Sequence, residues 1–455
     1  MSKKKLAKTI VYGCQMNESD AERMNGELES IGYEMTDDMT VADIILLVTC
    51  CVRETAEDKV YGKIGEIKHL KEHKPELILG VTGCMAQKEG EALIKRAPHI
   101  DFVLGTNKIH QLPEIVRSIE KRHVIERENT EESNSHKAGH FIDVEESETE
   151  LPDGIPVDRK GTLSAWIPVM YGCNNFCTYC IVPYVRGRER SRLPENVIAE
   201  VEEAVRKGYK EVTLLGQNVN SYGKDHNKAD FAELLEMTDR VPGIERIRYM
   251  TSHPKDLSDR VIAAVKNGTH ICEHFHLPVQ YGTDHMLKRM NRVYTVAQYK
   301  DLIRKIRSEI PDCSITTDLI VGFPGETDDD FESMLEFLKE IRYDAAYTFI
   351  YSKRSGTPAA SYPDQVPEDL KKERLHKLME VQNAISLEIN ERLNGTIQEV
   401  MAEGPSRNDS SVWTGRTRTG KIVLWGHEDE RPGDMLNIRI TKPQTWVLKG
   451  IRENA

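Results

Sequence analysis

The chain has 455 residues, too many for one hydrophobic core, so we expect two to four domains. It carries 62 Lys and Arg against 74 Asp and Glu residues, and this net charge of −12 excludes a generally basic surface for nucleic acid but not a local basic patch. No apolar run is long enough to cross a membrane and no export signal is present, which predicts a cytoplasmic protein. Nine cysteines in such a protein indicate metal or redox chemistry rather than disulfides.

Short apolar runs alternate with amphipathic stretches over residues 7–123, the expected N-terminal domain. This alternation predicts an α/β fold with a doubly wound parallel sheet, covered by helices on both faces. The expected strands and helices are Lys8–Tyr12, Asn17–Ile31, Asp43–Val48, Arg53–His73 and Leu77–Val81.

Each of these three strands leads into a cysteine, namely Cys14, Cys50 or Cys84. Because ligand sites in open parallel sheets lie beyond the carboxyl ends of the strands, we expect these distant cysteines to converge on one metal site. Cys51 adjoins Cys50, but consecutive side chains diverge, and Cys50 follows its strand as Cys84 does. The alternative interpretation is three buried cysteines that pack as small apolar residues.

Periodicity fades over residues 124–158, where acidic side chains outnumber basic ones. This composition predicts a solvated linker, with one short strand near His123–Ile125. Regular periodicity returns from residue 159, so the linker separates two folded parts.

Six apolar runs alternate with helical patterns such as Pro194–Lys207 and Thr327–Ile341 over residues 159–387. Six strand–helix units are too few for a full barrel of eight, so a partial (β/α)6 barrel is predicted. Its active face would lie at the carboxyl ends of the strands. The expected strands are Ser164–Met170, Glu211–Leu215, Ile244–Met250, Glu273–Leu277, Ile315–Val321 and Ala345–Tyr351.

Cys173, Cys177 and Cys180 lie in one short loop after the first of these strands. Three thiolates at this spacing can hold three irons of a [4Fe–4S] cluster and leave the fourth iron open to a small molecule, whereas an electron carrier normally uses four cysteines. A structural zinc is disfavoured because no nearby His or Cys supplies a fourth ligand. Tyr179 precedes the last cysteine, and its ring either packs against a cofactor or belongs to the core.

Loops rich in glycine, amide or hydroxyl groups follow the second, third and fifth of the six strands. Amide side chains there would bind a carboxylate and an amine, and a glycine would let the backbone approach an adenine or a ribose. Each loop is also compatible with an ordinary polar turn. The candidate cofactor-binding residues are Gly216, Gln217, Asn218, Ser252, Gly322, Pro324 and Gly325.

An arginine-rich segment follows the cysteine loop and ends at Arg192. Guanidinium is the favoured donor to phosphate and carboxylate, so a segment beside the active face is expected to contact the substrate. The alternative to substrate contact is a charged surface that is simply solvated. The candidate contacts are Arg186, Arg188 and Arg190.

A charged helix is expected over Glu368–Leu393, and short strands separated by Gly and Pro turns complete residues 388–452. This pattern predicts a small, OB-like β-barrel. Its cations are interleaved with Trp413 and Trp425, which suits phosphate contact and base stacking, although core packing accounts for either Trp equally well. The candidate RNA contacts are Arg416, Arg418 and Lys421.

With these motifs, the chain resembles the radical S-adenosylmethionine methylthiotransferases over nearly its whole length. The loop Cys173–Cys180 carries that family's signature, and the three strand-end cysteines fall on its auxiliary-cluster positions. The resemblance implies an auxiliary-cluster domain, a radical core and a C-terminal TRAM domain. It also implies two [4Fe–4S] clusters and S-adenosylmethionine as cofactors.

Gly13–Asp20 resembles the branch that acts on N6-isopentenyladenosine beside the tRNA anticodon, as do Cys51–Glu54, Gly83–Gln87 and Tyr351–Pro358. This implies that a 5′-deoxyadenosyl radical abstracts hydrogen from C2 of the base, and that a methylated sulfur from the auxiliary cluster replaces it. The implied product is 2-methylthio-N6-isopentenyladenosine at tRNA position 37. The implied partners are the tRNA anticodon stem-loop, an electron donor such as flavodoxin or ferredoxin, and a sulfur or cluster donor.

Other branches of the family methylthiolate threonylcarbamoyladenosine in tRNA or an aspartate of a ribosomal protein, and a non-catalytic iron–sulfur carrier is a further alternative. Two residues depart from the family's pattern: Val48 stands where Asn is common, and Tyr281 where a serine is usual. If Val48 borders the auxiliary cluster, it removes a hydrogen bond to the sulfurs or the substrate while the ligands remain.

Overall fold

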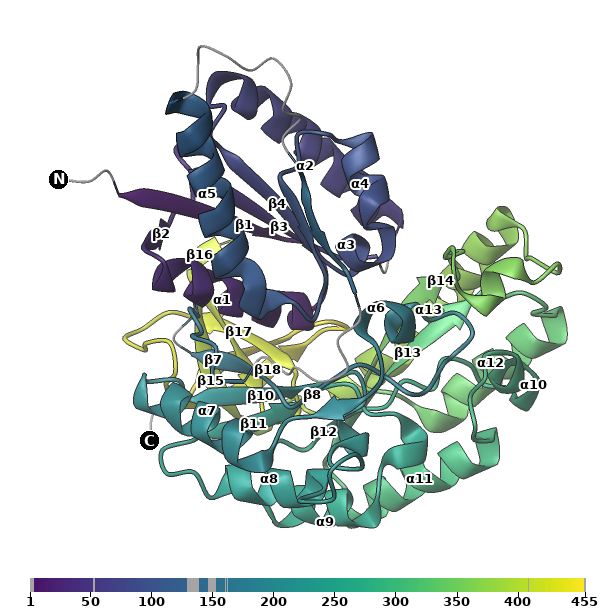
Figure 1. Cartoon of the computed structure of the whole chain (residues 1–455). Helices are drawn as coiled ribbons and strands as arrows, with labels where there is room; N and C mark the ends of the chain where they lie inside the picture. Colours follow the sequence, from purple (N-terminus) through teal and green to yellow (C-terminus); the bar gives the residue numbers. More distant parts are fainter. Residues whose placement is uncertain are drawn as a thin grey trace. The chain divides into compact units, whose positions relative to one another are not determined.

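The chain divides into two compact units in its computed structural model (Figure 1). One unit comprises Met1–Lys160, Tyr171–Asn174 and Ile181–Arg192, and the other comprises Gly161–Met170, Asn175–Cys180 and Leu193–Ala455. The structure describes residues 4–51, 54–128, 139–145, 153–159, 161, 163–407 and 409–453. Within these ranges, no helix is both long enough and apolar enough to span a bilayer.

A six-stranded parallel sheet forms the centre of the first unit, in the order β2-β1-β3-β4-β5-β6. The strands are β1 (Lys5–Val11), β2 (Tyr33–Met35), β3 (Ile44–Thr49), β4 (Ile78–Gly83), β5 (Phe102–Leu104) and β6 (Phe141–Asp143). The helices are α1 (Gln15–Ser30), α2 (Glu54–His73), α3 (Cys84–Glu89), α4 (Glu91–Arg96) and α5 (Leu112–Glu128), with a 3-10 turn at Ile109–Gln111.

Successive side chains of β3 belong to opposite apolar clusters, because side chains alternate across a strand. Ile45 and Leu47 pack with residues of α2, α3 and α4, whereas Ile44, Leu46 and Val48 pack with residues of α1 and α5. The sheet is therefore covered on both faces, as the doubly wound prediction requires.

One prediction for the segment after residue 120 is wrong. His123–Ile125 is helical, because the apolar spacing that begins at Leu112 continues through Ile119 and carries α5 past these positions. A strand does occur in the expected linker, but it is β6, whose Phe141 pairs with Phe102 of β5. Three residues are too few to show the alternation that identifies a strand.

The second unit begins with six parallel strands, each followed by helix. They form two three-stranded sheets, β7-β10-β11 and β12-β13-β14, which a single bridge between Ile247 and Ile271 connects. The partial (β/α)6 barrel is thereby confirmed. The strands are β7 (Ser164–Pro168), β10 (Glu211–Leu215), β11 (Arg246–Tyr249), β12 (His274–His276), β13 (Ser314–Val321) and β14 (Ala345–Ile350).

Three of the helices around these strands begin with a capping box, whose N-cap residues are Asp230, Thr295 and Thr327. Short strands β8 (Met170–Tyr171) and β9 (Arg190–Ser191) flank the cysteine loop, and 3-10 turns occur at Val219–Ser221, Pro254–Asp256 and Pro358–Ser361. The helices are α6 (Val182–Arg186), α7 (Pro194–Arg206), α8 (Phe231–Asp239), α9 (Asp259–Asn267), α10 (Asp284–Arg289), α11 (Val296–Glu309), α12 (Asp328–Ile341) and α13 (Glu368–Glu391).

Five strands close into a small barrel after α13, in the order β15-β16-β17-β19-β18, as predicted. They are β15 (Ile397–Ser406), β16 (Asp409–Thr417), β17 (Ile422–Gly426), β18 (Met435–Pro443) and β19 (Leu448–Arg452). Trp413 and Trp425 are 5% and 3% exposed and pack with Val400 and Ile438 in the core of this barrel. Core packing is thus the correct account of both, and neither presents a face for base stacking.

Candidate active site

Three cysteines of the first unit lie at the carboxyl ends of adjacent strands. Cys14, Cys50 and Cys84 follow β1, β3 and β4, and the strand order reverses between β1 and β3, where open α/β sheets bind ligands. The backbone there is tightly packed, since a Cβ on Gly13 would lie 2.7 Å from Cβ and 3.2 Å from Sγ of Cys50. The structure brings the predicted positions to one edge of the sheet, and their role as metal ligands stays a prediction.

Asn17 and Thr49 connect the ends of these strands. Asn17 is fully buried and donates from Nδ2 to the carbonyl oxygens of Tyr12, at 2.8 Å, and Thr49, at 3.0 Å. The Thr49 hydroxyl donates in turn to the carbonyl oxygen of Thr82 at 2.6 Å. The backbone just before each of the three cysteines is therefore fixed by buried hydrogen bonds.

Arg186 of α6 lies beside these cysteines, buried to 2% exposure. Its Nη2 donates to Oδ1 of Asn17 at 2.7 Å and to Oδ2 of Asp20 at 2.8 Å. Burial alone would lower the pKa of Arg186, but Asp20 and the thiols of Cys84 and Cys14 raise it, so the guanidinium stays charged. The Nη2 group of Arg186 thus serves buried partners, and a contact of this residue with the substrate stays a prediction.

The thiol of Cys51, the residue after Cys50, lies beside Cys84. It shares a hydrogen bond with Cys84 that lowers the pKa of Cys84, an effect to which Arg186 adds, and the same bond together with burial raises the pKa of Cys51. Cys51 also packs in the apolar cluster on the α2 face. The hydrogen bond therefore favours Cys84 as the thiolate of this pair, and the choice of Cys50 rather than Cys51 as the third ligand stays a prediction.

The loop Cys173–Cys180 begins in the first unit and ends in the second, and each part bonds to the unit to which it belongs. In the first unit, the Cys173 amide donates to the carbonyl oxygen of Gly187 at 3.1 Å. In the second unit, the Thr178 amide donates to the carbonyl oxygen of Met290 at 3.1 Å, and its hydroxyl to that of Arg289 at 2.9 Å. The cysteine side chains thus project from a backbone with little freedom.

Arg292 is a buried residue at this loop that the sequence analysis missed. Its Nη1 donates to Sγ of Cys177 at 3.4 Å, its Nε donates to the Tyr294 hydroxyl at 2.9 Å, and its Nη2 donates to the carbonyl oxygen of Pro278. Burial would lower the pKa of Arg292, but Tyr294, Tyr179 and Cys177 raise it, which keeps a positive charge beside the cysteine.

Tyr179 packs against the main core of the second unit, with its ring edge-on to Phe323 at a centroid distance of 6.4 Å. Burial raises the pKa of Tyr179 well above its usual value, so its hydroxyl is neutral. These contacts account for Tyr179 as a core residue, and a cofactor contact stays a prediction.

Asn218 is fully buried after β10 and bonds to the loop that follows β11. Its Nδ2 donates to Oδ2 of Asp256 at 2.7 Å, and its Oδ1 accepts from the His253 amide at 3.0 Å. Gln217 beside it is half-buried. Asn218 therefore joins two strand-end loops, and the amide that was expected to bind a cofactor already has protein partners.

Backbone strain marks two of the strand ends. Thr251 has φ +66° and Gln280 has φ +72°, a left-handed region that β-branched and bulky residues rarely adopt. Ser252 follows Thr251, is 1% exposed, and its hydroxyl has no hydrogen-bond partner among the described residues. Strained residues and unsatisfied buried groups concentrate at functional sites, so Ser252 suits a bound polar ligand.

The candidate glycines are explained by packing inside the protein. A Cβ would come within 2.6 Å of Met170 at Gly216, 2.2 Å of Lys371 at Gly322, and 2.5 Å of Arg289 at Gly325. Pro324 is buried, and its carbonyl oxygen accepts from Nε of Arg289 at 2.9 Å. Packing, together with a positive φ at Gly322 and Gly325, accounts for these glycines without any cofactor, and cofactor contacts there stay predictions.

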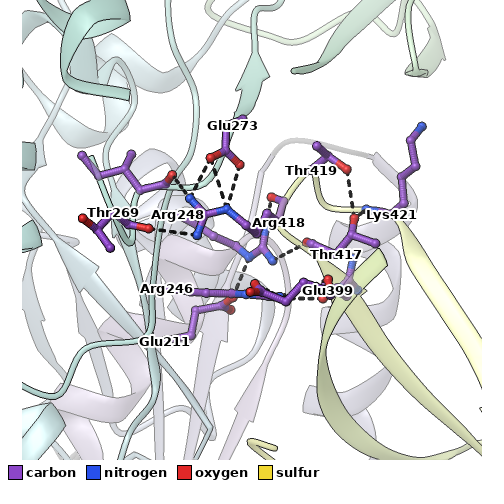
Figure 2. Close-up of polar contacts among 12 residues, drawn as sticks. Glu211, Arg246, Arg248, Thr269, Glu273, Glu399, Thr417, Arg418, Thr419 and Lys421 are labelled. Carbon is purple, nitrogen blue, oxygen red and sulfur yellow. Dashed lines mark hydrogen bonds and ion pairs between the residues drawn. The ribbon is translucent and has the colours of Figure 1, made fainter. Parts of the chain in front are cut away.

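Arg418, whose contacts Figure 2 shows, bonds to residues of the (β/α)6 core, Lys421 bonds to that core and to α13, and the contact of both with RNA stays a prediction. Arg418 forms a forked pair with Glu273, at 2.9 Å from Nε and 2.7 Å from Nη2, and donates to the carbonyl oxygens of Thr269 and Ile271. Lys421 bonds to Asp344 at 2.8 Å and to Asn390 at 2.9 Å. Both cations hold the turn between β16 and β17 against the (β/α)6 core.

Two core arginines also bond to the barrel, Arg248 at this turn and Arg246 at β15, as Figure 2 shows. Arg248 donates to the carbonyl oxygens of Thr417, at 2.9 Å, and Arg418, at 3.1 Å, and Arg246 donates to Oε1 of Glu399 at 3.0 Å. The remaining candidates are more accessible: Arg188 is exposed, Arg190 is half-buried, and Arg416 pairs with Glu403 at 43% side-chain exposure.

The donor set suits iron–sulfur clusters, which thiolates bind. Each cysteine trio includes one sulfur beside a buried arginine, Cys84 with Arg186 and Cys177 with Arg292, and a cation there offsets the charge of thiolate ligands. No group of three His, Cys, Asp or Glu side chains in the described part of the chain is already closed around a metal-sized space.

Two family models match the chain. One describes the radical SAM superfamily and matches residues 167–338, and the other describes an uncharacterized protein family, UPF0004, and matches residues 7–105.

Curated relatives resemble the chain from end to end. A protein of Desulforamulus reducens is 50% identical over 99% of this chain and 96% of its own length, and its name is tRNA-2-methylthio-N(6)-dimethylallyladenosine synthase. Proteins with the same name from Carboxydothermus hydrogenoformans and Clostridium botulinum (strain Hall) are each 48% identical, over 97% and 96% of this chain and 98% and 95% of their own lengths.

Solved structures share the fold at low sequence identity. The radical S-adenosylmethionine methyltransferase TsrM from Kitasatospora setae matches with a TM-score of 0.56 and 13% identity, over 88% of this chain and 79% of that one. The cobalamin-dependent S-adenosylmethionine radical enzyme OxsB matches with a TM-score of 0.52 and 13% identity, over 83% and 57%. Similarity at this level concerns the arrangement of the elements alone.

Proposed function

The chain belongs to the tRNA-2-methylthio-N(6)-dimethylallyladenosine synthase family of radical SAM enzymes, and from this premise we propose that it methylthiolates C2 of N6-isopentenyladenosine at tRNA position 37. The observation that carries the proposal is the placement of Cys14, Cys50 and Cys84 at the ends of adjacent strands, in a chain that also has the Cys173–Cys180 motif. A reaction that both generates a radical and donates sulfur needs two such sets of three cysteines.

In this proposal, the two trios hold two [4Fe–4S] clusters, which together with S-adenosylmethionine supply radical hydrogen abstraction and a methylated sulfur. The protein's part is to bind, to orient and to keep water away. Arg292 donates a hydrogen bond to the sulfur of Cys177 and stays positively charged beside it. The unpaired hydroxyl of Ser252, at the carboxyl end of β11, is the first candidate for a bond to bound S-adenosylmethionine.

The proposed substrate sets the remaining partners. The target base must be unstacked from the anticodon loop before its C2 is reached, and single-stranded loops permit this. Arg188, Arg190 and Arg416 are the accessible cations that we assign to its phosphates. An electron donor such as flavodoxin or ferredoxin and a sulfur or cluster donor complete the reaction, and a tRNA substrate places it in the cytoplasm.

Metal quantitation tests the two cysteine trios. Anaerobically reconstituted protein is expected to hold about eight irons per chain, the content of two cubane clusters. The triple variant C14A/C50A/C84A should lose half of this iron, and C173A/C177A/C180A the other half. One cluster in the unmodified chain would contradict the proposal.

Nucleoside analysis tests the substrate. In a deletion strain, mass spectrometry of digested tRNA is expected to show loss of 2-methylthio-N6-isopentenyladenosine and accumulation of its precursor without the methylthio group. Loss of methylthiolated threonylcarbamoyladenosine, or of methylthio-aspartate in a ribosomal protein, would instead assign the chain to another branch.

A further inference from the structure

Arg186 connects the segment that follows the Cys173–Cys180 loop with the cysteine edge of the first unit. The residue after it, Gly187, accepts the Cys173 amide at 3.1 Å through its carbonyl oxygen. Its helix is anchored in the same unit: Val185 is buried in the α2-face cluster, and its carbonyl oxygen accepts from the Thr106 hydroxyl at 2.8 Å. The side chain of Arg186 therefore extends from a backbone that hydrogen bonds and packing hold in place.

The guanidinium completes a buried polar network at the strand ends. Asp20 is 2% exposed and pairs with Arg186 at 2.8 Å, and Asn17 accepts from the same nitrogen at 2.7 Å. Asn17 uses its remaining donors on the backbone that precedes Cys14 and Cys50. Removing Arg186 would leave Asp20 as a buried charge without its cation, next to the backbone that carries the predicted ligands.

We propose that Arg186 is a positioning residue of the auxiliary site: it orients the backbone before Cys14 and Cys50 through Asn17, and it supplies the positive charge that balances the thiolates. This inference rests on the proposed function, because it assumes that Cys14, Cys50 and Cys84 bind a cluster. Three thiolates give an oxidised [4Fe–4S] cluster a net negative charge, and reduction adds another. A fixed cation nearby favours the reduced form and so raises the reduction potential.

The test uses the full chain with Cys173, Cys177 and Cys180 replaced by Ala, so that only the auxiliary cluster titrates. In this parent, R186Q is expected to make the midpoint potential more negative and to speed iron release to a chelator about tenfold, as loss of a partner of a metal ligand does. R186K should recover part of the potential, because it restores the charge without the forked geometry.

A double variant separates positioning from stability. R186Q/D20N removes both members of the buried pair and should recover much of the thermal stability that R186Q loses, while iron release stays fast because the bond from Arg186 to Asn17 is still missing. R117Q, which removes an exposed arginine of α5, is the matched control and should change neither measurement.

The outcomes distinguish this inference from the proposed function. A parent protein without iron would overturn both. A parent that binds iron, with an R186Q variant whose potential and iron release match the parent, would overturn only the role of Arg186. Iron release from R186Q/D20N that is as slow as from the parent would also overturn it, because the effect would then come from the unpaired Asp20.

Discussion

At the scale of single residues, the cysteines were predictable and their arginine partners were not. The cysteines stand in local patterns: one short loop, and three positions directly after apolar runs. Arg186 reaches Asn17 across 169 positions, and Arg292 reaches Cys177 across 115, so no local spacing reveals either contact. Charge runs look alike whether they are solvated or buried, so the sequence does not reveal the burial of Arg186.

Replacement of Arg292 is the first residue-scale prediction. R292Q removes the donor to Cys177 and leaves the surrounding buried acceptors short of partners, so the free energy of unfolding should fall by about 2–4 kcal/mol. Iron bound by the Cys173–Cys180 motif should be lost faster than in the unmodified chain. Denaturant titration and chelator kinetics measure the two effects, and R304Q, on an exposed ion pair of α11, serves as the control.

The second residue-scale prediction concerns pH. Burial, with help from Arg248, lowers the pKa of His274 to about 3, whereas an unfolded His titrates near 6.5. The unfolded chain therefore binds the extra proton first, so His274 contributes its full stability above about pH 6.5 and loses it as the pH falls towards 3.

Between about pH 6.5 and 3, the free energy of unfolding should fall less steeply for H274Q than for the unmodified chain. The difference in slope should be up to about 1.4 kcal/mol per pH unit, the value for one titrating proton. Denaturant midpoints at pH 7, 6 and 5 check the result. H69Q replaces a His with 78% side-chain exposure and should leave the slope unchanged. Equal slopes for H274Q and the unmodified chain would contradict the assignment.

At the scale of elements, strands with a clear apolar run were predicted closely. β10 coincides with the expected Glu211–Leu215, and α13 ends two positions before the expected Leu393. Short strands such as β2 and β5 are not predicted, because tertiary pairing rather than a local pattern stabilises three residues in extended form. The strand expected at His123–Ile125 failed for the opposite reason, since a local apolar triplet lay inside a longer helical period.

The turn between β16 and β17 carries the element-scale prediction. R418A should lower the free energy of unfolding by about 2 kcal/mol, because a forked ion pair and two bonds to backbone carbonyls are lost together. A double-mutant cycle with E273A should give a coupling of about 1 kcal/mol, as both side chains are partly exposed. Zero coupling would show that the pair does not hold the turn.

At the scale of the whole molecule, the sequence predicts the kind of reaction better than the contacts with the substrate. Motif spacing and family resemblance lead to the chemistry, whereas RNA contacts depend on which cations remain accessible after folding. Arg418 and Lys421 looked suitable in the sequence, but the acids that bind them, Glu273 and Asp344, belong to distant elements of the core.

Binding of tRNA by a chain with net charge −12 should depend on few cations, and its affinity should fall as salt rises. R416A is expected to weaken binding and to lower the slope of log affinity against log salt by about one unit. K421A should leave this slope unchanged, since its ammonium is committed to Asp344. Fluorescence anisotropy with an anticodon stem-loop measures both, and a reduced slope for K421A would identify Lys421 as a phosphate contact.

The two indoles enclosed by the C-terminal barrel give the protein a built-in optical probe. Trp413 and Trp425 are shielded from water, and Nε1 of Trp425 donates to Glu430 at 3.0 Å, so their emission reports whether this one module is intact. Trp446 is 60% exposed and contributes a nearly constant background, and the half-buried Trp166 of β7 has to be replaced by Phe so that the signal comes from the barrel alone. A red shift of the buried emission would therefore time the opening of the barrel without any attached dye.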